Sequence, residues 1–171
     1  MLKIHYSQET LELASQEEQR LANLGQTVLR AHPRKSGQVS LVLTDDNHMR
    51  LLNDRHRGVG HTTDVLSFDY LADTDPSPPA PGMDLVSGEI YISRDRAQEQ
   101  ARDQRVSLLE EIARLTVHGL LHLAGFEHDT PEKLRTMESE TDALLLTADL
   151  LPAVVSIQPE TVLAGGVTGK E

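Results

Sequence analysis

Three histidines lie within one short stretch of the chain and are the residues best suited to chemistry. His118 and His122 are four residues apart in a segment with helical apolar spacing, so on a helix they share one face. Gly125 can end that helix in a left-handed conformation, which would bring His128 back to the same point. In a chain without cysteine, three imidazoles suit a divalent transition metal. We therefore predict one Zn²⁺ ion per chain, with a fourth position open to water or substrate.

A purely structural origin of these histidines is the first alternative. Two histidines with this spacing occur by chance in many helices. Here, however, a third histidine follows, and the intervening residues include three leucines and one phenylalanine. An imidazole is costly to bury among such side chains unless a partner satisfies it. The pattern thus favours a metal site over three core histidines.

The spacing His-x3-His-x2-Gly-x2-His also matches the metzincin metalloproteases, which makes a metallopeptidase an alternative function. Those enzymes carry a glutamate directly after the first histidine, where it acts as the general base. In this chain that position is Gly119, which has no side chain. A peptidase of this mechanism would lack its base. We expect Gly119 instead to leave room beside the metal for a bulky substrate.

The block from His118 to His128 resembles the signature of the YbeY family, the bacterial metal-dependent endoribonucleases and ribosomal RNA maturation factors. Further matches are Asn53, Arg57, the stretch Thr-Asp-Val-Leu-Ser-Phe at 63–68 and, more weakly, Gly-Glu-Ile-Tyr-Ile-Ser at 88–93. Together these matches span roughly residues 41–145. The chain departs from the family pattern at Thr62, where proline is usual, and at His56, where tyrosine is frequent.

The resemblance implies a single-strand-specific, zinc-dependent endoribonuclease that acts in ribosomal RNA maturation, including 3′-end processing of the small-subunit RNA, and in ribosome quality control. It implies RNA as a partner, with the ribosome or small-subunit proteins as further partners. It also places Arg57 near the metal, among the catalytic residues with the three histidines. The planar guanidinium suits two phosphate oxygens. The alternative role for Arg57 is a salt bridge to Asp54 or Asp64.

A third hypothesis is a non-catalytic ribosome-assembly protein whose metal only stabilises the fold. Such a site would need a closed fourth ligand, which Asp129 or Glu127 could supply. Glu111 lies seven residues before His118, on nearly the same helix face. We expect it to be an exposed helix residue, with support of a ligand histidine as the alternative.

Composition is compatible with an intracellular enzyme. The 171 residues contain no cysteine and no apolar run near 18 residues, and the N-terminus is too polar for a signal peptide. We therefore predict a cytoplasmic protein that does not contact the membrane. The net charge of −11 argues against general nucleic-acid binding, but residues 28–61 contain six basic residues and three acidic ones.

The apolar periodicity predicts one domain at 1–150 and a poorly ordered tail at 151–171. Expected strands span about 2–6, 39–43, 63–68 and 86–92, and the last is expected to run antiparallel to the third. Expected helices span about 7–31, with Ser7 as N-cap, and then 44–56, 93–105 and 131–146. A further helix is expected to start at about 106 and to carry His118 and His122, and a proline-rich loop is expected at 71–84. Alternating strands and helices predict an α+β (α/β-like) domain, a four-stranded mixed sheet packed with helices, with a zincin-like three-histidine site at a helix end.

Overall fold

A four-stranded mixed sheet forms the centre of the computed structural model, which describes residues 1–32, 38–70, 86–148 and 150. The strands are β1 (Leu2–Tyr6), β2 (Gln38–Thr44), β3 (Val65–Asp69) and β4 (Val86–Ser93), in the spatial order β1-β2-β4-β3. β1 and β4 both run parallel to β2, whereas β3 is antiparallel to β4. The mixed four-stranded sheet predicted from the sequence is confirmed, including the antiparallel last pair.

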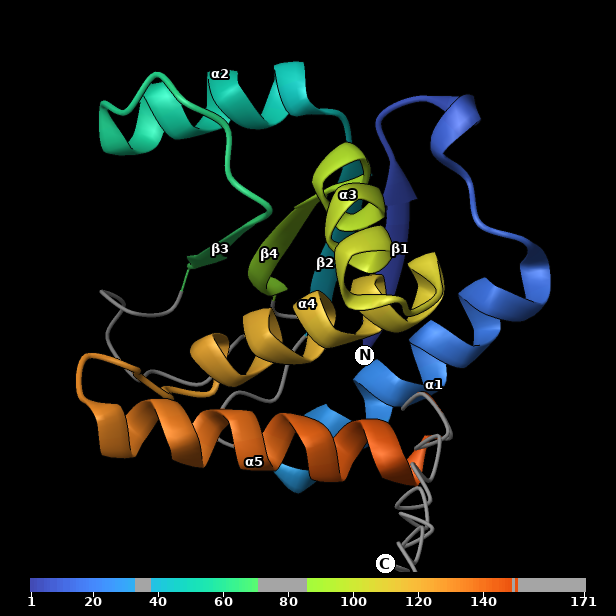
Figure 1. The fold of residues 1–171 in the computed structure, drawn as a ribbon, viewed down its shortest axis with the longest axis vertical. Coiled ribbons are helices and arrows are strands. Elements are labelled where there is room, and N and C mark those ends of the chain that lie inside the picture. The colour runs from blue at the N-terminus through green and yellow to red at the C-terminus, as the bar shows by residue number, and fades with distance from the viewer. Residues whose placement is uncertain (33–37, 71–85, 149, 151–171) are drawn as a thin grey trace, which may run out of the picture.

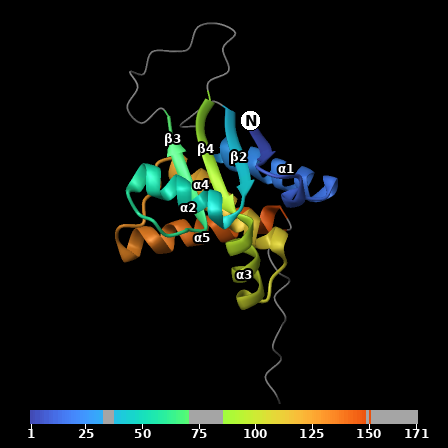
Figure 2. The ribbon, with the colours of Figure 1, turned by 90° about the horizontal axis from the view of Figure 1, so that it is seen from above.

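The helices cover both faces of this sheet (Figures 1 and 2). They are α1 (Ser15–Ala31), α2 (Asp46–Arg57), α3 (Arg94–Gln104), α4 (Leu108–Leu123) and α5 (Pro131–Thr147), with a short 3₁₀ turn, η1 (Glu9–Leu11). α1 and α4 pack against each other and against the sheet, and α5 covers α4 from outside. α2 lies across the sheet from them, and α3 continues directly from β4.

Strand alternation decides which side chains meet α4. In the antiparallel register Val65 pairs with Ile92 and Ser67 pairs with Ile90, so these four side chains share the face toward α4. Leu66 pairs with Tyr91 and points to the opposite face, toward α2. Because β3 is the edge strand, residues on its α4-facing side stand at the border of the core.

α4 is the central helix of the core. Eleven of its sixteen residues are buried, because it packs between the sheet and the helices α1, α3 and α5. Its start is fixed by a capping box: Glu110 N–H donates to Ser107 Oγ at 3.2 Å, and Ser107 N–H donates to Glu110 Oε2 at 2.6 Å. Its end is followed by Gly125 with φ 94°, the left-handed conformation expected there.

The expected helix start at Ser7 is wrong. Ser7 extends the strand pairing instead: its N–H donates to the Leu43 carbonyl at 3.0 Å, and its Oγ accepts a hydrogen bond from Thr44 Oγ1 at 2.9 Å. The chain passes through η1, and α1 begins only at Ser15, where the Glu17 side chain accepts a hydrogen bond from Ala14 N–H at 3.1 Å. The helix ends at Ala31, as predicted.

Two predictions concern segments outside the described residues: the proline-rich loop at 71–84 and the tail at 151–171. The domain boundary at residue 150 also stays a prediction. Among the helices that the structure describes, none has the length and apolar character needed to span a bilayer.

Candidate metal centre

The three predicted ligand histidines come together at the C-terminal end of α4. One ring nitrogen from each of His118, His122 and His128 lies within 4.8 Å of the other two, a spacing that allows all three to bind one ion. His122 Nε2 is 3.1 Å from His118 Nε2. The ring of His128 lies 5.5 Å from that of His118 and 4.9 Å from that of His122, measured between centroids. The predicted convergence is confirmed.

Local structure around Gly125 fixes the orientation of the His122 ring. After α4 ends, Phe126 N–H donates to the Leu121 carbonyl at 2.9 Å, which turns the chain back along the helix. The Phe126 carbonyl then lies 3.0 Å from His122 Nδ1. A carbonyl only accepts, so Nδ1 must carry the proton and Nε2 keeps its lone pair toward His118. This is the tautomer that a metal ligand needs.

Burial favours the neutral form of His118 and His122. Burial lowers the pKa of His118 to about 4, and the nearby His122, His128 and Arg114 act in the same direction. Burial also lowers the pKa of His122, although its hydrogen bond to Phe126 opposes that shift. Neutral imidazole is the metal-binding form, so both rings are ready to coordinate an ion at neutral pH.

A pocket of about 460 Å³ opens in front of the histidines. Besides the three rings, it is lined by Arg57, Thr63, Asp64, Val65 and Ser67. Arg57 is the last residue of α2 and is exposed, and no ion pair joins it to any part of the chain that the structure describes. The salt bridge considered from the sequence, to Asp54 or Asp64, is therefore not formed. The guanidinium of Arg57 is available to a ligand in the pocket.

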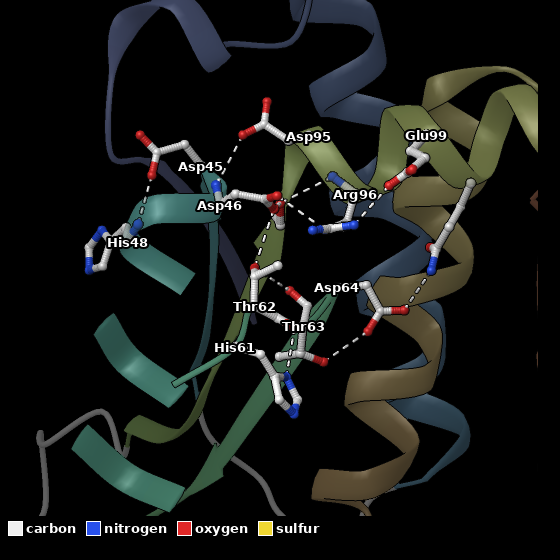
Figure 3. Close-up of polar contacts among 12 residues, drawn as sticks. Asp45, Asp46, His48, His61, Thr62, Thr63, Asp64, Asp95, Arg96 and Glu99 are labelled. Carbon is white, nitrogen blue, oxygen red and sulfur yellow. Dashed lines mark hydrogen bonds and ion pairs between the residues drawn. The ribbon is translucent and has the colours of Figure 1, made fainter. Parts of the chain in front are cut away.

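The loop between α2 and β3 carries part of the pocket wall and is held by a polar network (Figure 3). Asp46, in the first turn of α2, is its centre: its carboxylate accepts hydrogen bonds from Ser93 Oγ at 2.5 Å and Thr62 Oγ1 at 3.3 Å. Arg96 Nε lies 3.1 Å from the other Asp46 oxygen. Thr62, which replaces the expected proline, thus joins the loop to α2 and the β4–α3 junction.

Asp64 faces the pocket from this loop, and neighbouring groups fix its carboxylate. One oxygen accepts from Val65 N–H at 2.8 Å and from Thr63 Oγ1 at 3.3 Å. The other accepts from Gln100 Nε2 on α3 at 3.0 Å. The Asp64 carbonyl also accepts from Ser93 N–H at 2.8 Å. Its negative charge therefore stands at a defined place near His118, where it opposes the lowering of that ring's pKa.

Comparison with known proteins decides the family. The family model described as endoribonuclease YbeY matches residues 3–149. This chain belongs to the YbeY endoribonuclease family. The YbeY endoribonuclease of Symbiobacterium thermophilum is 34% identical over 145 residues, covering 83% of this chain and 93% of the relative. That of Moorella thermoacetica is 45% identical over 111 residues, covering 63% of this chain and 70% of the relative.

A solved structure supports the fold. The solution structure of TM1509 from Thermotoga maritima aligns with a TM-score of 0.56 and 20% sequence identity, over 92% of this chain and all of that protein. At that identity the match concerns the fold alone. It agrees with the α+β architecture described above.

Gly119 has a different role in this YbeY-family chain from the one expected. A Cβ at this position would lie 2.8 Å from Ile90 Cγ2 and 3.0 Å from Ser67 Oγ. The space is therefore filled by β3 and β4, and it is not open to substrate. The missing side chain lets α4 approach the sheet closely, which brings Ser67 to the edge of the pocket.

Glu111 is also placed differently from the expectation. It is 1% exposed, because α4 turns it into the interior, where Arg114 neutralises it. Arg114 donates from Nε to Glu111 Oε2 at 2.9 Å and from Nη2 to Oε1 at 2.5 Å. Sequence reasoning missed Arg114, although its spacing of three from Glu111 and four from His118 is a helical signal for contact with both.

The carboxylates considered as a fourth ligand are engaged elsewhere. Glu127 Oε2 lies 2.7 Å from Lys133 Nζ, and Asp129 Oδ1 lies 2.8 Å from it. Within the described residues, the candidate ligand group around His118 contains only histidines. An open fourth position is thus compatible with this site, as catalysis requires.

Asn53, a residue of the family pattern, supports the site indirectly. It is 2% exposed, and its Nδ2 donates to the His61 carbonyl at 2.8 Å, tying α2 to the loop that leads to Asp64. We expect Asn53→Ala to lower the free energy of unfolding by about 0.5–1.5 kcal/mol, because the hydrogen bond between α2 and the His61 carbonyl is lost. Urea unfolding measures this. Asn47→Ala, at an exposed position of the same helix, should change stability by less than about 0.5 kcal/mol. Equal effects of the two substitutions would contradict the supporting role.

Proposed function

We propose that this YbeY-family chain is a single-strand-specific, zinc-dependent endoribonuclease that acts in ribosomal RNA maturation. One observation carries the proposal: three imidazoles face a pocket that also contains an exposed guanidinium without an ion-pair partner among the described residues. Imidazole ligands suit zinc, and a guanidinium suits a phosphate. The family supplies RNA as the substrate class.

His118, His122 and His128 would hold the metal. When bound, the ion would supply Lewis acidity toward a phosphoryl oxygen and toward water. The Phe126 carbonyl keeps the proton of His122 on Nδ1, so Nε2 stays available as a ligand. Arg57 would bind the other phosphate oxygens and orient the scissile group. Asp64, fixed by Gln100 and the loop backbone, is placed to orient a water or hydroxyl group at the pocket wall.

The shape of the pocket favours unpaired RNA. The pocket is recessed between the end of α4, the edge strand β3 and the last turn of α2. A single strand can bend to bring one phosphate down to the histidines, whereas a duplex holds its phosphates on a stiff, wide cylinder. The basic C-terminal turn of α2, with Arg55, His56 and Arg57, stands beside this opening and favours a polyanion there.

Cleavage assays test the proposal. Metal-loaded protein is incubated with single-stranded RNA, duplex RNA and casein over a salt series, with and without chelator. We expect chelator-sensitive cleavage of single-stranded RNA that weakens as salt rises. Cleavage of casein alone would favour the peptidase. A folded, metal-loaded protein that cleaves neither would favour the assembly protein. The ribosomal role is tested by mapping small-subunit RNA 3′ ends in cells that carry only the His118→Ala protein.

The Arg57→Lys substitution tests whether Arg57 contributes bidentate phosphate recognition in addition to its positive charge. Lysine keeps the positive charge but cannot present two parallel N–H donors, so we expect cleavage to fall by about 10- to 100-fold. Stability should stay within about 0.5 kcal/mol, because Arg57 is exposed. The matched control is Arg50→Lys, at an exposed position of the same helix outside both the pocket lining and the basic C-terminal turn. Cleavage and thermal melting are measured on each preparation. Normal cleavage by Arg57→Lys, or its unfolding, would remove Arg57 from this role.

A further inference from the structure

A second pocket adjoins the candidate metal centre. It has a volume of about 430 Å³ and lies between α4 and α5. Arg114 and His118 line it from α4, and Leu134, Met137, Glu138, Thr141 and Asp142 line it from α5. His118 borders both this pocket and the one in front of the histidines, so the two are neighbours. A polymer with its phosphate at the histidines would therefore place an adjacent group in the second pocket.

Arg114 gives this pocket a rigid, flat wall. Its two hydrogen bonds to Glu111 form one bidentate pair. Because Glu111 is buried, this pair fixes the plane of the guanidinium. The side chain nevertheless keeps 36% of its surface exposed. A fixed guanidinium plane is a surface on which nucleobases stack in RNA complexes. Leu134, 40% exposed, adds an apolar surface from α5.

Charge determines which part of an RNA strand can enter. Glu138 and Asp142 are exposed on the α5 side, and the one cationic lining residue, Arg114, is already neutralised by Glu111. The resulting negative charge of the pocket repels a phosphate. It suits a base with an exocyclic amino group, because a carboxylate accepts hydrogen bonds from such a group. Adenine, cytosine and guanine carry one, and uracil does not.

We propose that the second pocket holds one nucleobase next to the cleaved phosphate, stacked on Arg114, with its amino group toward Glu138 or Asp142. This inference rests on the proposed function and deepens it: it makes these residues determinants of sequence preference. Adenine, cytosine or guanine is accepted at one flanking nucleotide, and uracil is disfavoured there.

Abasic substitution tests the inference. The bond cleaved in a single-stranded oligonucleotide is mapped first, and each flanking nucleotide is then made abasic in turn. We expect one abasic position to lower single-turnover kcat/KM about tenfold. Arg114→Lys keeps the charge but loses the guanidinium plane. It should lower kcat/KM for the intact substrate, and the abasic substitution should then lower kcat/KM little further. Glu138→Gln with Asp142→Asn should raise cleavage of the uracil substrate relative to the other three.

The control is Glu12→Gln with Asp103→Asn, which removes two exposed carboxylates outside both pockets and should keep the wild-type preferences. Each readout is a ratio between substrates within one protein, so a general loss of folded protein cancels. Wild-type cleavage of RNA that is unaffected by abasic substitution would overturn the inference, as would an unchanged abasic penalty in Arg114→Lys. Either result would mean that the second pocket does not bind a nucleobase and is suited to a different ligand, such as a basic peptide. If the wild type cleaves no RNA, the proposed function fails and this inference falls with it.

Discussion

His122→Ala is expected to abolish metal binding and to lower RNA cleavage by at least about a thousandfold. The structure holds this ring more firmly than the others, through the Phe126 carbonyl, and directs its Nε2 toward His118. Removing it leaves two imidazoles, too few for a stable zinc site. A metal contributes several kcal/mol to stabilising the transition-state charge, and each 1.36 kcal/mol corresponds to a factor of about ten in rate.

Elemental analysis and single-turnover cleavage check this expectation on the same preparation. His5→Ala is the matched control, because His5 is exposed on β1 and lies outside the ligand group. It should keep one ion per chain and the wild-type rate. Unchanged metal content in alanine variants of all three histidines would disprove the site.

Metal removal should leave the domain folded. The ligands lie within an eleven-residue stretch, from His118 to His128, so an ion would close only a short loop and constrain the unfolded chain little. The hydrophobic core, which includes Leu41, Ile90 and Ile112, contains none of the three ligand histidines. Circular dichroism before and after chelation tests this. Unfolding on chelation would instead support a structural metal.

Features that depend on local sequence could be predicted. The sheet strands follow from period-two alternation, and the histidine cluster follows from a four-residue spacing and a glycine turn, all within one stretch. That α1 begins only at Ser15, and not at Ser7, could not be predicted, because Ser7 is held by Leu43, far away in the sequence. Its local residues allow a helix, but pairing with β2 prevents it.

Features that depend on which segments pack together were missed or misjudged. Glu111 looks like a surface residue until α4 is placed at the centre of the core, and its burial then requires Arg114. Asp64 and Ser67 belong to a recognised stretch, but only the edge position of β3 shows that they line the pocket. Arg57 reaches the site from α2, so only the family resemblance indicated it.

Gly119 is the clearest example of a residue whose interpretation changes once its packing against the sheet is known. From the sequence it is the position where a peptidase would have its base. In the structure it is the point where α4 meets Ile90 and Ser67. A glutamate there would have to displace packed side chains and bury its carboxylate against them. The absence of a glutamate thus follows from packing as well as from chemistry.

We therefore expect Gly119→Glu to lower the free energy of unfolding by at least about 3 kcal/mol and to create no peptidase activity, since both overpacking and an unpaired buried charge are costly. Gly119→Ala should destabilise the protein less. Its Cβ would lie 2.8 Å from Ile90 Cγ2 and cause strain of about 1–3 kcal/mol, but the higher helix propensity of alanine offsets about 1 kcal/mol of this. Gly60→Glu is the control: a Cβ at Gly60 would meet only Asp54 Oδ1, at 3.9 Å, so stability should change by less than about 1 kcal/mol. Urea unfolding and casein cleavage are measured for all three variants. A stable Gly119→Glu protein that cleaves casein would show that the space beside the histidines is open, and that the close approach of α4 to the sheet does not determine this residue.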